Sequence, residues 1–295
     1  MQNTPQHISI MLLGCFSVFL SAFFFYLATV VIKLSQINGL NIEPAFFVFT
    51  RLFSGFILIS IIMLIQKKKI IIRNKSYLIN RAVFNTIAVY CFFKAVSLTT
   101  VAQANILNMT FPLFIALFSW IFLKDQWELV SSIIVILAFV GVWLILSPKK
   151  MSFNLNSLWG LASGISAAIG IIYLNISRKV HDTQTILFFM FGIGSLITYI
   201  LFFDKIGIPD IKEFKYLFWC SFFSFAGQIL ITLGFKYITA IEGGIISSMR
   251  ILLAAILTPF IIAGSPVLSV FGWLGAFLIF IGNVYLTTRK TIHHA

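Results

Sequence analysis

The sequence predicts an all-α membrane protein of ten transmembrane helices, arranged as two inverted five-helix repeats. Hydrophobic residues make up 60% of the 295 residues and charged residues only 10%, with a mean hydropathy of +1.04. A soluble domain carries charge on roughly a quarter of its residues, so lipid must cover most of this surface. The apolar residues also come in blocks of about 20, long enough to cross a ~30 Å hydrocarbon layer, and each half of the chain holds five of them.

Each block is predicted to form one membrane-spanning helix. Block 46–65 is apolar on every face, which differs from the alternating pattern of a β-barrel strand. The very short joints at 98–100 and 264–266 make the helices that flank them antiparallel hairpins. The expected spans are 8–32, 45–65, 82–97, 101–123, 129–146, 158–176, 185–203, 216–235, 240–263 and 268–287.

The positions of lysine and arginine predict how the spans are oriented. A cytoplasmic N-terminus places the dense basic cluster after the second span in the cytoplasm, together with most other basic joints. That cluster holds Lys67, Lys68, Lys69, Arg73 and Lys75. We therefore expect a multi-pass protein of the bacterial inner membrane with both termini in the cytoplasm. The first block lacks a small-residue cleavage site, so we expect it to remain as a span.

Composition also excludes several classes of protein. The net charge of +13 does not indicate a nucleic-acid partner, because anionic lipid and orientation rules explain basic residues in joints and at span ends. Cys15, Cys91 and Cys220 all lie inside apolar blocks, so no disulfide framework, metal site or cofactor is expected. An enzyme is not expected either, because the histidines and aspartates lie at termini, joints or span edges.

The chain contains two related halves, 1–148 and 149–295. The pair Phe93-Lys94 closes one span of the first half, and Phe235-Lys236 closes the corresponding span of the second half. Near the ends of the fifth and tenth spans, 139–143 resembles 280–284. Because each repeat has an odd number of spans, the second repeat must enter the membrane upside down, as in secondary transporters.

Nearly the whole chain resembles the EamA-type ten-span permeases of the drug/metabolite transporter superfamily. Arg51-Leu52-Phe53 resembles the signature of the second span of that family, and Lys124-Asp125 stands where its fourth span commonly ends. A pattern of small residues leading to a proline is also similar: Ala95, Thr99, Ala102, Ala104, Leu107 and Pro112. The resemblance implies a ten-helix carrier, and the family transports amino acids, sugar derivatives, nucleotide-like metabolites and toxic compounds.

Charged side chains inside the hydrocarbon layer cost about 2.5–3.5 kcal/mol each on the insertion scale, so each needs a reason. Arg51 in the second span and Arg250 in the ninth can hold a carboxylate or phosphate with their planar fork of donors. Arg51 can instead snorkel or bond backbone carbonyls of neighbouring helices. Glu242 either relays a proton or caps the start of the ninth span, where the helix dipole favours a carboxylate.

Amides in the fourth span supply further candidates. Asn105, Asn108 and Pro112 lie at i, i+3 and i+7, so they share one face of a helix. The two amides either line a cavity or bond between helices. Tyr90 in the third span joins the candidate site, because a buried hydroxyl needs a polar partner.

These features predict a secondary transporter, permease or exporter, of a small polar organic metabolite such as an amino acid or a nucleotide-like solute. It would work by alternating access around a central site, where Arg51 and Arg250 bind an anionic or zwitterionic solute. The expected partners are this solute and the lipid bilayer, and a homodimer is left open. The alternative is a flippase of lipids or lipid-linked precursors, which would need a basic groove open to the bilayer.

Overall fold

The computed structural model describes residues 4–68, 70–123, 129–146, 155–237, 240–262, 264 and 268–292. All regular structure in these ranges is helical. The α-helices are α1 (Thr4–Ile37), α2 (Pro44–Ile65), α3 (Lys75–Leu98), α4 (Val101–Asn108), α5 (Phe111–Leu123), α6 (Leu129–Leu146), α7 (Leu158–Arg178), α8 (Thr183–Leu201), α9 (Ile211–Tyr237), α10 (Ala240–Ile261) and α11 (Val270–Ile292). Two short 3-10 turns, η1 (Leu155–Ser157) and η2 (Phe203–Lys205), precede α7 and follow α8.

The ten predicted spans are confirmed as apolar helical segments. Six helices are long and apolar enough to cross a membrane, and four shorter apolar segments supply the rest of the described spans. The third span is longer than expected, because α3 begins at Lys75 rather than at residue 82. Asn74 caps it by accepting a hydrogen bond of 3.1 Å from the backbone N–H of Ser76. Arg81, which directly precedes the predicted span 82–97, therefore lies inside the helix.

The fourth span is not one helix but two, α4 and α5, separated at Met109 and Thr110. Pro112 explains the break, because it has no N–H to donate to the carbonyl oxygen of Asn108 four residues earlier. The next N–H, of Leu113, bonds to Thr110 instead of to Met109. Asn283 of α11 donates its side-chain amide to the Met109 carbonyl at 2.8 Å. A neighbouring helix thus satisfies a backbone group that the break releases.

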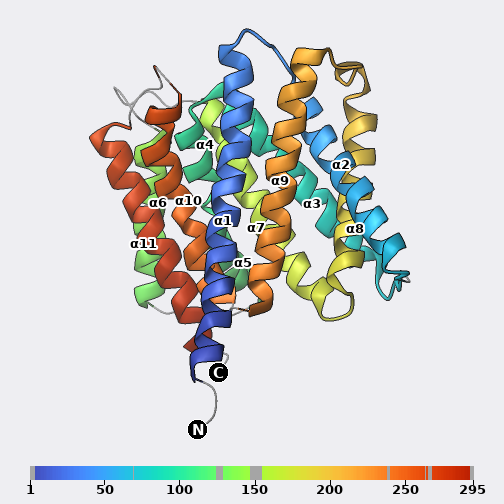
Figure 1. Cartoon of the computed structure of the whole chain (residues 1–295). Coiled ribbons are helices and arrows are strands. Elements are labelled where there is room, and N and C mark those ends of the chain that lie inside the picture. Colours follow the sequence, from blue (N-terminus) through green and yellow to red (C-terminus); the bar gives the residue numbers. More distant parts are fainter. Residues whose placement is uncertain are drawn as a thin grey trace.

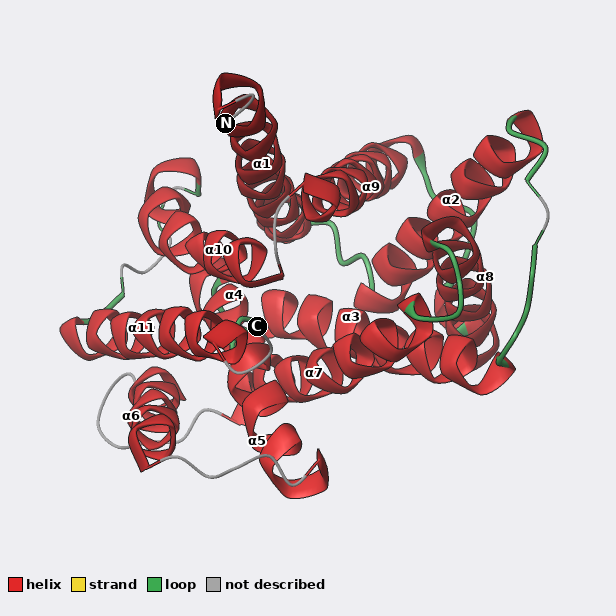
Figure 2. Cartoon of the chain, turned by 90° about the horizontal axis from the view of Figure 1, so that it is seen from below, coloured by secondary structure: helices red, strands yellow, loops and turns green. Residues whose placement is uncertain are grey.

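The two halves are interleaved by an approximate two-fold relation. If α7 to α11 repeat α1 to α6, with α4 and α5 as one span, then α1 corresponds to α7 and α3 to α9. The structure packs α1 against α9 and α3 against α7, a pair of contacts that this relation exchanges (Figure 2). It also packs α2 on α8, α4 on α10 and α6 on α11, each helix against its own counterpart. Both ends of the described chain, the start of α1 and the end of α11, lie at the same end of the molecule (Figure 1).

The related motifs at 139–143 and 280–284 both lie at the contact between α6 and α11. A Cβ built on Gly141 of α6 would lie 2.7 Å from the carbonyl oxygen of Gly275 of α11. A Cβ built on Gly282 would lie 2.9 Å from the Cβ of Ala138. Small residues therefore let the backbones of α6 and α11 approach closely, which is how helices associate in lipid. The repeated glycine has a packing role.

Candidate functional site: two arginines between the repeats

Arg250 of α10 lies at the contact between the two halves. Its side chain is 7% exposed, and its Nη2 donates a hydrogen bond to Oδ1 of Asn108, the last residue of α4. The guanidinium carbon stands 5.3 Å from the ring centre of Phe92 of α3. A guanidinium over an aromatic face is attracted by the ring quadrupole, more strongly where water is excluded. Arg250 thus joins the second half to two helices of the first.

Asn108 is held in place by a second neighbour. Its Nδ2 donates to Oγ of Ser163 of α7 at 3.0 Å, and Ser163 donates in turn to the carbonyl oxygen of Gly160 at 2.7 Å. The side chain is 8% exposed. The amide oxygen therefore faces Arg250 and the amide nitrogen faces α7, which fixes its orientation. The break in the fourth span places this side chain where α4, α7 and α10 meet.

Arg51 of α2 occupies an aromatic pocket. Its guanidinium carbon is 5.6 Å from the ring centres of both Phe25 of α1 and Phe93 of α3. The thiol of Cys220 of α9 lies within electrostatic range. Within the described residues the guanidinium has neither an ion pair nor a hydrogen-bond acceptor. In the described part of the chain, cation–π attraction to these two rings is what stabilises the charge.

The two arginines lie within electrostatic range of each other. The charge of Arg51 acts on Arg250, and the rings below them, Phe93 and Phe92, are neighbours in sequence with centres 6.0 Å apart. One short stretch of α3 therefore carries a ring for each guanidinium. The acidic side chains that the structure describes lie instead at helix ends and in loops: Glu43, Asp182, Asp204, Asp210 and Glu213. Among the side chains that the structure describes, the two arginines therefore have positive charge that no neighbouring carboxylate compensates.

The other predicted site residues are Asn105, Tyr90 and Glu242, and the first two have partners other than the arginines. Asn105 is fully buried and donates to Oγ1 of Thr29 of α1 at 3.0 Å, so it bonds α4 to α1 and not to the α7 and α10 partners of Asn108. Tyr90 stacks on Phe202 with 4.7 Å between ring centres and meets Trp159 edge-on. The side chain of Glu242 lies outside the residues that the structure describes.

Sequence reasoning missed three contributors to this region, which are Phe92, Phe93 and Ser163. Phe92 and Phe93 could not be chosen among 34 phenylalanines, although Phe93 already marked the repeat. Ser163 is an ordinary small residue of an apolar helix. Arg81 corrects the predicted start of the third span, because it lies inside α3. It is 8% exposed, and a Cβ built on Gly170 of α7 would lie 3.0 Å from its Nη1. The signal that could have found it is an arginine next to an apolar block.

Contacts between the halves also close one end of the molecule. Lys68, after α2, pairs with Asp182, before α8, at 2.7 Å, and the side chain of Gln184 donates to that of Gln66 at 2.7 Å. Nε2 of His181 accepts hydrogen bonds from the backbone N–H groups of residues 73 and 74, at 3.1 and 3.3 Å. We call this set of contacts, between 66–74 and 181–184, the loop latch.

The pKa of Asp182 shows how firmly the ion pair of the latch is set. Burial raises the pKa of this carboxyl, but hydrogen bonds and charge from Lys68 and a hydrogen bond from Thr185 outweigh burial and bring the pKa below its usual 3.8. A carboxyl with a lowered pKa stabilises the closed arrangement above its ordinary pKa and loses this effect only as the pH falls through the lowered value. The ion pair is therefore intact throughout the neutral range.

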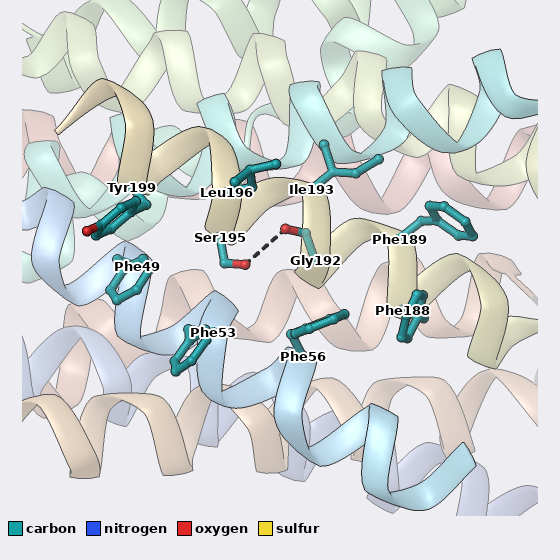
Figure 3. A pocket seen from close by; sticks show the side chains of 10 residues that line it. All are labelled: Phe49, Phe53, Phe56, Phe188, Phe189, Gly192, Ile193, Ser195, Leu196 and Tyr199. Carbon is teal, nitrogen blue, oxygen red and sulfur yellow. Dashed lines mark hydrogen bonds between the residues drawn. The ribbon is translucent and has the colours of Figure 1, made fainter. Parts of the chain in front are cut away.

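A separate hollow of about 570 Å³ lies between α2 and α8 (Figure 3). Rings of α2 (Phe49, Phe53 and Phe56) face rings of α8 (Phe188 and Tyr199) across it. Its serine hydroxyl, that of Ser195, donates to the carbonyl oxygen of Gly192 at 2.9 Å. This hollow is apolar and includes neither arginine, so it offers little to a polar solute.

Comparison with known proteins agrees with this architecture. A solved crystal structure of a protein superposes with a TM-score of 0.59 at 18% identity, covering 93% of this chain and 97% of that one, which shows a shared fold. An uncharacterized transporter of Archaeoglobus fulgidus is 28% identical over 61% of this chain and 64% of its own. The pseudopaline exporter CntI of Pseudomonas aeruginosa is 25% identical over 55% of this chain and 58% of its own.

Human solute carrier family 35 member G1 is 24% identical over 94% of this chain and 80% of its own. The matches to the archaeal and Pseudomonas proteins thus span less than two thirds of those relatives, whereas the human match spans most of both chains. The model of the EamA-like transporter family matches twice, over residues 12–147 and 155–288. The chain, a multi-pass membrane protein and not an enzyme, therefore belongs to the EamA-like transporter family.

Proposed function

We propose that this protein is a secondary transporter that moves a small polar organic metabolite with an anionic group across the bacterial inner membrane. The observation that carries the proposal is Arg250, buried between the repeats and hydrogen-bonded to Asn108 at the broken fourth span. A charge at membrane depth marks a functional site by default, and broken helices at the contact of inverted repeats are typical of transporter sites.

The solute would bind between the halves, with its anionic group on Arg250 and Arg51. Asn108 would orient Arg250 toward the solute, since Ser163 fixes the amide from the opposite side. The termini lie at the end of the molecule that carries the loop latch, and we assign this end to the cytoplasm because of its basic cluster. The flippase alternative loses support, because the groove between α2 and α8 is apolar rather than basic.

The first test is a thermal-shift screen of the detergent-purified protein against polar metabolites, followed by flux into proteoliposomes. A true ligand stabilises the folded state by mass action, so the melting temperature should rise with its concentration. Compounds that shift the melting temperature should be transported. Liposomes without the protein are the control, and they measure the passive leak of each compound. If no polar metabolite shifts the melting temperature or enters the vesicles, whereas a fluorescent lipid changes leaflet, the flippase alternative replaces this proposal.

Alternating access further predicts that the loop latch must open and close in each cycle. We therefore expect flux to stop when Lys68→Cys and Asp182→Cys are joined by a short, reducible bifunctional thiol reagent, in a chain whose three natural cysteines are replaced by alanine. Reduction should restore the flux. Each single cysteine variant, treated in the same way, is the matched control. Undiminished flux in the cross-linked protein would show that this end stays closed during transport.

A further inference from the structure

We infer that the solute is a dianion whose two negative charges are neutralised by Arg51 and Arg250, of the class of short dicarboxylates or phosphate monoesters. The inference rests on the proposed transport function and narrows its substrate. The inference excludes zwitterionic amino acids that carry no further charged group as the preferred solute.

The first step concerns unused hydrogen-bond donors. A guanidinium has five N–H donors in a fixed fork. Arg250 uses its Nη2 on Asn108, while its Nε is buried and lacks a partner in the described part of the chain. Arg51 has rings on two sides and, within the described residues, no acceptor for its own donors. As far as the described side chains go, the site therefore presents two forks of donors that protein acceptors leave largely free, and each fork matches a carboxylate or phosphate bidentately.

The second step concerns charge. Two positive charges that act on each other are enclosed here without a described carboxylate beside them. A monoanion would neutralise only one of them. The other charge would remain unpaired in a medium of low dielectric constant, where an unpaired charge is costly. A zwitterion would add an ammonium group to a region that is already positive. Two negative charges on one solute neutralise the pair, so a dianion gains the most from this site.

The third step concerns geometry. Phe92 and Phe93, whose ring centres are 6.0 Å apart, each lie beneath one guanidinium. The two arginines come from different halves, α2 and α10, but share α3 as a platform. A single small solute can therefore bridge them. Bridging also ties the halves together around the solute, which couples binding to the arrangement of the repeats.

The experiment compares dianions with matched monoanions on the purified full-length protein at pH 8 and fixed ionic strength. The probes are succinate with succinamate, glutarate with glutaramate, and glycerol 3-phosphate with its methyl diester. We expect at least one dianion to raise the melting temperature, and its monoanion to bind at least tenfold more weakly. The dicarboxylate and phosphate arms show which anionic group is preferred.

Arg51→Gln supplies the discriminating variant. In this variant the dianion should lose at least tenfold in affinity and bind no better than its monoanion, whereas a merely structural role of Arg51 would weaken both equally. Circular dichroism and the gel-filtration profile check that the variant is folded. Equal binding of dianion and monoanion to the unmodified protein, or binding of a zwitterion in preference to every dianion, overturns the inference but leaves the transport function standing. Absence of any bound or transported metabolite overturns both.

Discussion

Arg250→Ala is expected to reduce solute flux by 100-fold or more while the protein still inserts into the membrane. The substitution removes the guanidinium between the halves and leaves the Asn108 amide oxygen without its donor. The substitution also removes the partner of the anionic group of the solute, and truncating one member of such a buried, hydrogen-bonded charge pair costs about 2–5 kcal/mol, or roughly 30-fold to several thousand-fold in affinity. Insertion should not suffer, because a central arginine itself costs about 2.5–3.5 kcal/mol to place in the membrane. Flux into proteoliposomes with equal protein content measures the loss.

Two further variants make this result interpretable. Arg250→Lys keeps the charge but not the planar fork, so its flux should fall between those of the alanine variant and the unmodified protein. Arg178→Ala is the control, because it removes an exposed cation in the last turn of α7 that has no part in the candidate site. It should transport normally. Unaltered flux through Arg250→Ala would remove Arg250 from the site and, with it, the observation that supports the function.

The fold could be predicted from the sequence because lipid leaves few solutions. A chain in hydrocarbon must satisfy every backbone N–H and C=O group internally, so long apolar blocks become helices. The same reasoning singled out Arg51 and Arg250, since buried charge is rare enough in a membrane to require a partner or a function. The structure places both at the contact between the halves. Their role in transport remains a prediction.

The partners of these residues were not predictable, because they depend on tertiary contacts. By their spacing, Asn105 and Asn108 share one face of a helix. In the structure, however, Asn105 donates a hydrogen bond to Thr29 of α1, whereas Asn108 donates to Ser163 of α7. The break after Asn108 has a local cause in Pro112, but its repair by Asn283 comes from more than 170 residues away. Arg81 fell outside the predicted span 82–97 because a helix in the membrane can extend beyond its apolar block to a polar cap.

Gly164→Leu is expected to have the second largest effect, on stability and transport together. Gly164 of α7 faces the break in the fourth span, and a Cβ at this position would lie 2.5 Å from Oγ1 of Thr110 and 3.0 Å from the carbonyl oxygen of Leu107. A carbonyl of the backbone cannot rotate away as the end of a side chain can. Overpacking commonly costs 1–3 kcal/mol, and we expect about 3 kcal/mol here.

The added side chain should also move α7 away from α4 and pull Ser163, the preceding residue, from Asn108, so that Arg250 loses its oriented partner. Thermal unfolding and proteoliposome flux measure the two consequences. Gly207→Leu is the matched control, because nothing lies within 4 Å of a Cβ built on Gly207. A variant Gly164→Leu that is less stable but transports at the normal rate would mean that the site does not need Asn108 held by α7. Loss of flux in excess of the loss of folded protein would instead tie the broken span to the transport step itself.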